Sequence, residues 1–83
     1  IGGGGDALPA LLERSFERLH PGGRLVATAV LVESAAALST VLAPYRRELL
    51  TVNVSRAAAL GDHHCFKAEN PITLAVFVKP EKE

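Results

Sequence analysis

The sequence predicts an α/β fold, and three of its features indicate this class. Apolar residues recur at helical spacing from Leu8 to Leu19, so a helix here has one apolar face. Residues 24–32, RLVATAVLV, are rich in valine and uncharged after the first position. Such a run is typical of a strand buried on both faces, and residues 72–78, ITLAVFV, have the same character. Helices and buried strands therefore share one short chain.

The first helix is predicted to follow a glycine loop at residues 2–5. Asp6 is suited to cap its N-terminus, because a carboxylate there accepts hydrogen bonds from the first free amides. Pro9 falls in the first turn, where proline is tolerated. Residues 20–23, HPGG, contain one proline and two glycines and are expected to end the helix.

A second helix is predicted to begin at Glu33 or Ser34. The three alanines that follow, at positions 35–37, have a high helix propensity. Its expected buried stripe is Leu38, Val41, Leu42 and Tyr45. Residues 49–55, LLTVNVS, alternate between apolar and polar, which predicts a half-buried strand. Residues 58–64 are expected to form a loop around Gly61 and Asp62, followed by a short extended stretch.

The connections between these elements predict the topology of the sheet. Strands 24–32 and 49–55 are joined through a helix, so they are expected to be parallel, with a right-handed crossover. The last strand follows without a helix and is expected to be antiparallel. Both helices then cover one face, and the rest of the chain or another subunit must cover the other. That second face is expected to include Val26, Val30, Leu74 and Val76.

Size and composition exclude several classes of protein. The 83 residues form at most one small domain, and nine Lys plus Arg balance nine Asp plus Glu. No basic excess is present to neutralise phosphates, so we expect no nucleic-acid partner. No apolar run approaches the roughly 20 residues of a membrane span, so we expect no membrane partner. One cysteine excludes an internal disulfide and, without a signal-peptide pattern, favours the cytoplasm.

The glycine loop is open to several interpretations. Gly2, Gly4 and Ala7 fit the spacing G-x-G-x-x-A, which suggests a fragment of a dinucleotide-binding oxidoreductase. Four consecutive glycines match almost any glycine pattern, however, so a simple turn fits equally well. A third interpretation is a loop that lets the backbone approach a ligand closely. A non-enzymatic α/β interaction module is a further alternative for the whole chain.

His63, His64 and Cys65 form the only cluster of metal-ligating residue types. Adjacent residues of an extended chain point to opposite sides, so at most two of them can bind one ion. Zinc takes four ligands, and we therefore expect no metal site. A histidine near neutral pH can still donate a hydrogen bond to a substrate carboxylate. The same geometry makes an activated cysteine nucleophile improbable.

Several segments together resemble the decarboxylating precorrin methyltransferases of cobalamin biosynthesis. The turn at residues 19–23, LHPGG, resembles the L-x-P-G-G turn before the fifth strand of class I S-adenosylmethionine-dependent methyltransferases. Four stretches carry the resemblance to the precorrin enzymes, namely residues 1–5, 22–33, 52–56 and 66–72. The similarity extends over nearly the whole chain and ends near Pro80.

The resemblance implies an α/β fold in which residues 1–83 are the C-terminal half of a Rossmann-like class I methyltransferase sheet. Its order is helix-strand-helix-strand-strand, with the last strand antiparallel. The N-terminal, cofactor-binding half is expected to be absent from this chain, which opens on Ile1 and glycines. The implied activity is C-methylation of a precorrin with decarboxylation, using S-adenosylmethionine, in a homo-oligomer.

The resemblance also implies candidate site residues. Gly2 and Gly3 are expected near the cofactor, and Gly4 and Gly5 near the tetrapyrrole substrate, because this loop matches the loop after the family's fourth strand. Thr28 takes the place of an asparagine common in the family and is a further candidate for substrate binding. The polar groups for decarboxylation are expected to be Glu33, His63 and His64.

Overall fold

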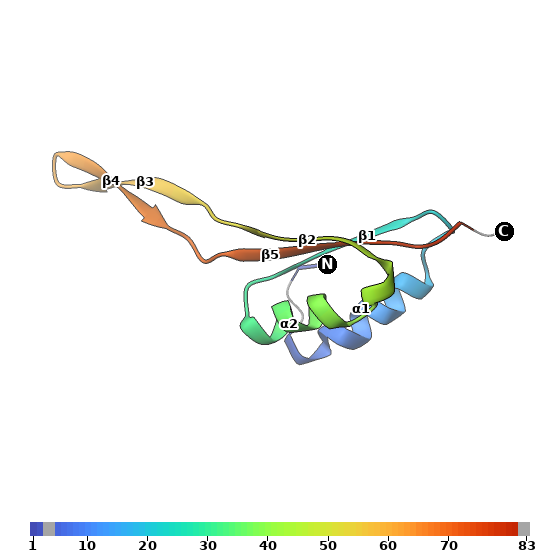
Figure 1. Cartoon of the computed structure of the whole chain (residues 1–83). Coiled ribbons are helices and arrows are strands. Elements are labelled where there is room, and N and C mark those ends of the chain that lie inside the picture. The colour runs from blue at the N-terminus through green and yellow to red at the C-terminus, as the bar shows by residue number, and fades with distance from the viewer. Residues whose placement is uncertain (3–4, 82–83) are drawn as a thin grey trace.

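The computed structural model describes residues 1–2 and 5–81 of the chain. Two helices, two short 3-10 helices and five strands follow one another (Figure 1). In chain order they are η1 (Gly5–Ala7), α1 (Leu8–Glu17), β1 (Arg24–Ala29), α2 (Val32–Thr40), η2 (Ala43–Tyr45), β2 (Arg46–Val52), β3 (Ser55–Leu60), β4 (His63–Ala68) and β5 (Ile72–Val78). The predicted α/β class is confirmed.

Three strands form an antiparallel sheet in the order β1-β5-β2. The central strand β5 is antiparallel to both neighbours, with Val26 opposite Val76 on one side and Leu50 opposite Leu74 on the other. Strands β1 and β2 are consequently parallel to each other. The predicted strand directions, including the antiparallel last strand, are therefore confirmed.

The start of the chain adds a further parallel pairing at the outer edge of β1. Gly2 forms an isolated parallel bridge with Thr28. The N-terminal amine of Ile1 donates to the Val26 carbonyl at 2.8 Å, and the Thr28 amide donates to the Ile1 carbonyl at 2.8 Å. Ile1 and Gly2 thus lie where a fourth strand, parallel to β1, belongs.

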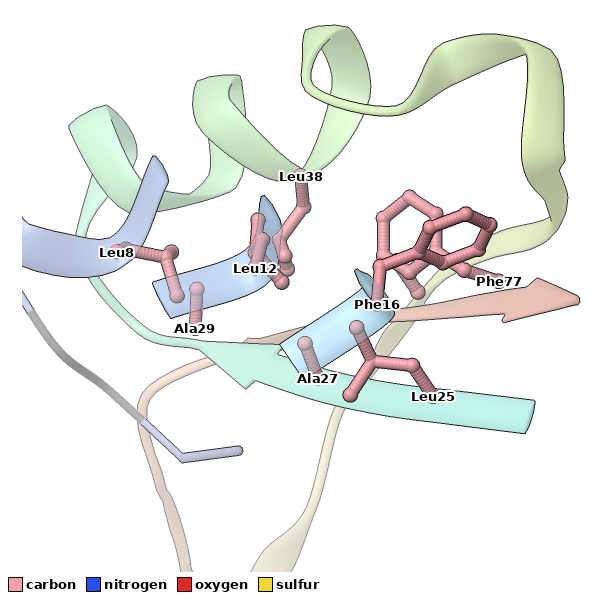
Figure 2. Packing of buried hydrophobic residues seen from close by; sticks show 9 residues of the cluster. Leu8, Leu12, Phe16, Leu25, Ala27, Ala29, Leu38 and Phe77 are labelled. Carbon is pink, nitrogen blue, oxygen red and sulfur yellow. The ribbon is translucent and has the colours of Figure 1, made fainter. Parts of the chain in front are cut away.

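Both helices pack on the same face of this sheet and build the core with it (Figures 1 and 2). Helix α1 contributes side chains spaced four residues apart, which places them on one helical face. The phenyl ring of Phe16 also lies 4.8 Å from the Tyr45 ring, centroid to centroid. The buried core consists of Leu8, Leu12, Phe16, Leu25, Ala27, Ala29, Leu38, Ala75 and Phe77. The predicted single helical layer is confirmed.

The opposite face of the sheet is apolar and only partly covered. Val26 and Val30 are 46% and 53% exposed, whereas Leu74 and Val76 are half-buried. In β1 the buried positions alternate with exposed ones, so the strand is buried on one face only within this chain. Within the described residues no second layer packs on this face, so its covering by the rest of the chain or by another subunit stays a prediction.

The element ends differ from the sequence prediction in several places. Strand β1 ends at Ala29 and α2 already begins at Val32, so the valine-rich run divides between a strand and a helix. Asp6 does not cap α1, since it lies in η1 and Ala7 is the preceding residue, with no side-chain capping bond. Strand β2 begins at Arg46, three residues before the predicted start.

The largest correction concerns residues 58–64, which were expected to form a loop. They belong to an antiparallel hairpin of β3 and β4, in which Ala57 pairs with Phe66 and Leu60 with His63. Gly61 and Asp62 make the two-residue turn, and Gly61 has a φ of 58°, a conformation that glycine adopts without steric cost. The hairpin extends far beyond the sheet (Figure 1), and the molecule measures 62 × 25 × 17 Å.

Candidate functional site

The structure brings together two of the predicted site residues, Gly2 and Thr28, at the outer edge of β1. They are paired in the parallel bridge, and the Thr28 hydroxyl lies 3.5 Å from the Ile1 carbonyl oxygen, a long hydrogen bond. A Cβ atom at Gly2 would lie 3.6 Å from Thr28 Oγ1, an ordinary contact distance. The candidate cofactor and substrate positions are thus immediate neighbours.

Gly5 lies at the start of η1, directly before α1. Its φ is 52°, and a Cβ built there would meet nothing within 4 Å. Glycine is therefore favoured here by the backbone conformation and not by crowding, and the surrounding space is open. The other two candidates of this loop, Gly3 and Gly4, lie outside the described residues.

Beyond the carboxyl end of β1 the chain exposes three consecutive apolar side chains. Val30, Leu31 and Val32 are 53%, 56% and 79% exposed. Glu33 follows in the first turn of α2 and is also exposed. Ligands of open α/β sheets bind at the carboxyl ends of parallel strands, which is where this run lies. The sequence pattern does not indicate this exposed run, because all three residues fit the predicted strand 24–32.

The two candidate histidines lie elsewhere. His63 and His64 are exposed neighbours on β4, and the alternation of the strand directs their side chains to opposite faces of the hairpin. The hairpin extends away from the two helices (Figure 1), so α2, which carries Glu33, lies apart from β4, which carries both histidines. The structure therefore does not assemble the three predicted catalytic residues into one cluster, and the histidines lie in a strand instead of a loop.

The described residues form no enclosed pocket. Among them, no three His, Cys, Asp or Glu side chains are grouped closely enough to hold a metal ion. Cys65 is exposed and has a free thiol. None of the helices in the described part of the chain is long and apolar enough to cross a membrane. The candidate site is consequently the open edge formed by Gly2, Thr28 and the segment after β1.

The sheet order and the single helical layer are those of part of a class I methyltransferase fold. Solved domains of this class superpose closely on the chain. A precorrin-6Y C5,15-methyltransferase domain from Corynebacterium diphtheriae has a TM-score of 0.82 at 33% identity and covers 95% of this chain and 46% of its own. A precorrin 8W decarboxylase from Methanobacterium thermoautotrophicum has a TM-score of 0.80 at 28% identity, covering 93% of this chain and 42% of its own.

Within this class, residues 1–79 match the precorrin methyltransferase domain, and the chain belongs to that family. It is 37% identical to the cobalt-precorrin-6B C(15)-methyltransferase (decarboxylating) of Salmonella typhimurium, over 98% of this chain and 44% of that protein. The chain thus spans less than half the length of this relative. Membership favours the methyltransferase interpretation over an oxidoreductase fragment or an interaction module.

Proposed function

We propose that the protein to which these residues belong methylates a carbon of a precorrin intermediate and removes a carboxyl group from it. The observation that carries this proposal is the family match over residues 1–79. It is supported by relatives named as decarboxylating methyltransferases at 36–37% identity. The proposal places the reaction in cobalamin biosynthesis, in the cytoplasm, and involves neither nucleic acid nor a membrane.

In this proposal residues 1–83 are the C-terminal half of one methyltransferase domain. Ile1 and Gly2 hydrogen-bond with β1 as a parallel strand end does, which supports a sheet that continues on that side. The family's principal cofactor loop lies in the half upstream. Gly2 and Gly3 then approach the methyl donor from one side only, and Gly4, Gly5 and Thr28 approach the tetrapyrrole.

The described residues fit such a role at the open edge. S-adenosylmethionine, when bound, supplies a methyl group activated by its sulfonium centre. The space around Gly5 and the paired backbone of Gly2 let a flat substrate lie close to the chain. Methyl transfer makes little demand on acids and bases, and positioning supplies much of its rate. An edge without a cluster of titratable groups is therefore compatible with this chemistry.

The substrate-binding role of Thr28 is testable in the full-length protein. Thr28→Val keeps the side-chain volume and removes the hydroxyl, so we expect turnover with a precorrin substrate to fall about 10-fold, the equivalent of one hydrogen bond of about 1.4 kcal/mol. Thr51→Val, at an exposed threonine of β2, is the matched control and is expected to leave turnover unchanged. Equal turnover in both variants would remove Thr28 from the site.

Decarboxylation is proposed to use Glu33, His63 or His64, and product analysis separates it from methylation. We expect Glu33→Gln to lower carbon dioxide release more than methyl incorporation, since Glu33 follows the exposed run after β1. His63→Gln and His64→Gln test the two hairpin positions in the same assay. A residue whose replacement leaves the ratio of the two products unchanged has no part in decarboxylation.

A further inference from the structure

Three consecutive apolar side chains follow strand β1 and are open to solvent. Val30, Leu31 and Val32 are 53%, 56% and 79% exposed. In the part of the chain that the structure describes, no other three successive large apolar side chains are exposed. A single exposed apolar residue is ordinary on a protein surface, whereas a contiguous exposed group marks a surface that contacts something else. We call these three residues the apolar run.

The stability of the following helix does not explain the apolar run. Leu31 is the N-cap residue of α2, with an extended backbone at φ −72° and ψ 145° and no side-chain hydrogen bond to the helix. In this conformation Ser, Thr, Asp or Asn caps a helix and makes it more stable. Leucine at this position therefore leaves α2 less stable than a polar residue would. Local preferences of this kind are broken mainly where a residue serves a function.

The apolar run lies beside the candidate site at the edge of β1. Thr28, which is paired with Gly2, precedes Val30 by two residues. The 3-10 helix η1, which begins at Gly5, contacts α2, whose first residue is Val32. The starts of α1 and α2 and the end of β1 thus lie at the same end of the sheet (Figures 1 and 2). The open space around Gly5 and the apolar run share this end.

We propose, building on the proposed function, that the ring of the tetrapyrrole substrate lies on the apolar run and that Leu31 is a specificity-determining residue. A tetrapyrrole has a broad, mostly hydrocarbon ring and carries its carboxylates on side chains. The side chains of the apolar run have no charge and no hydrogen-bonding group, so they suit the ring and not the carboxylates. Ligand sites combine apolar walls with a few polar groups, and Thr28 and Glu33 flank the run.

The occupant of the apolar run is the substrate and not the upstream part of the protein, because of how far the neighbouring chain extends along β1. Gly2 is opposite Thr28, and from Gly5 onwards the chain is in η1. The parallel pairing at this edge therefore reaches Thr28, two residues before the apolar run. Ligands of open α/β sheets bind beyond the carboxyl ends of the strands, and the apolar run occupies this position at β1.

The test is the binding of cobalt-precorrin-6B, the compound in the name of the Salmonella typhimurium relative, and of its cobalt-free form to the full-length protein. S-adenosylmethionine is left out, so the absorption of the ring reports the dissociation constant without turnover. We expect Leu31→Ser to raise this constant at least 10-fold, the equivalent of about 1.4 kcal/mol. The increase is expected at low and at high salt, because ions do not screen an apolar contact.

The melting temperature separates this role of Leu31 from a structural one. Serine can cap α2, so we expect Leu31→Ser to melt at the same temperature as the wild type or higher, although it binds the ring more weakly. Leu49→Ser is the matched control, because Leu49 is 42% exposed on β2, at the opposite edge of the sheet. Its dissociation constant is expected to equal that of the wild type.

Each alternative outcome overturns the role of Leu31. Equal binding by Leu31→Ser and the wild type, or an equal loss in Leu49→Ser, does so and leaves the proposed function intact. A loss of affinity that disappears at high salt assigns the effect to charge and not to the apolar contact. A lower melting temperature of Leu31→Ser shows that another part of the protein covers the apolar run. A wild-type protein that binds neither form of the precorrin overturns the proposed function as well.

Discussion

Gly22 shows how single residues determine the path of the chain between α1 and β1. Its φ is 83°, which side chains with a Cβ rarely adopt, and its amide donates to the Lys79 carbonyl at 2.9 Å. Beside it, a Cβ at Gly23 would lie 2.8 Å from the His20 carbonyl oxygen, closer than real Cβ contacts. Both glycines of the turn are thus required by geometry, one by φ and one by space.

We expect Gly22→Ala to lower the free energy of unfolding by about 1–2 kcal/mol, the cost of a left-handed conformation for a residue with a Cβ. Urea titration of the full-length protein measures this. A Cβ at Gly22 would also touch the exposed Glu81 carboxylate, so the same change is made in a Glu81→Ala background. If that background restores the lost stability, the cost comes from the contact and not from φ.

Lys79 links the end of β5 to the end of α1. Its ammonium donates to the Phe16 carbonyl at 3.3 Å and the Glu17 carbonyl at 2.9 Å, and it lies 5.7 Å from the centroid of the Phe16 ring. The last carbonyls of a helix have no partner within the helix, and a cation there also interacts favourably with the helix dipole. The position of Lys79 directly after the last strand gives no indication of this role in the sequence, and only the fold provides it.

Replacing this lysine by methionine keeps the aliphatic chain and removes the charge. We expect Lys79→Met to lower the free energy of unfolding by about 1 kcal/mol. Lys67→Met, at an exposed lysine of the hairpin, is the control and is expected to change it by less than about 0.5 kcal/mol. Equal effects of the two substitutions would show that the contacts of Lys79 with α1 contribute nothing.

At the scale of elements, α1 is the part of the molecule that the sequence predicts best. Its buried residues, Leu8, Leu12 and Phe16, are spaced by four and face the sheet, as their periodicity indicates (Figure 2). Leu11 belonged to the predicted apolar stripe but is 39% exposed. The sheet contacts only a narrow part of the helix surface, and the flank that carries Leu11 remains open.

The difference between these two leucines is measurable. Leu12 is fully buried, so we expect Leu12→Ala to cost about 2–5 kcal/mol of unfolding free energy through lost burial and a cavity. Leu11→Ala removes the same atoms from a partly exposed position and is expected to cost less than about 1 kcal/mol. The measurement is made in the full-length protein. Similar losses of unfolding free energy in the two variants would show that another part of that protein covers Leu11.

The hairpin is the element that the sequence analysis missed. A Gly-Asp pair between two six-residue stretches is a recognised signal for a two-residue hairpin turn. The alanines of β3 and the polar residues of β4 have weak strand propensity and do not alternate clearly in hydrophobicity. The pairing of the two strands, and not the preference of either alone, determines their structure.

At the scale of the whole molecule, the sheet of the described residues is exposed on one face and at the outer edge of β1. The face opposite the helices exposes Val26, and beside β1 only Ile1 and Gly2 occupy the position of the next parallel strand. The chain matches less than half of the length of these curated relatives, and in the proposed function it is one half of a domain. Under the proposed function, binding of the methyl donor depends on both halves.

We therefore expect residues 1–83 alone to show no binding of S-adenosylmethionine by titration calorimetry. The full-length protein, titrated under the same conditions, is the positive control and is expected to bind. Micromolar affinity in the isolated 83 residues would mean that the glycine loop and its neighbours form a sufficient site, contrary to the proposed division between the halves.

The sequence by itself determined the α/β class, the first helix, the directions of the three sheet strands and the family. These features depend on local periodicity, on connection length and on contiguous motifs, all of which are present in the linear chain. Only the tertiary structure decided that Gly2 lies beside Thr28 and that the hairpin carrying His63 and His64 extends away from the helices. Contacts between distant segments depend on which strands pair and on which face of the sheet the helices cover. The local sequence around a residue does not determine either of these.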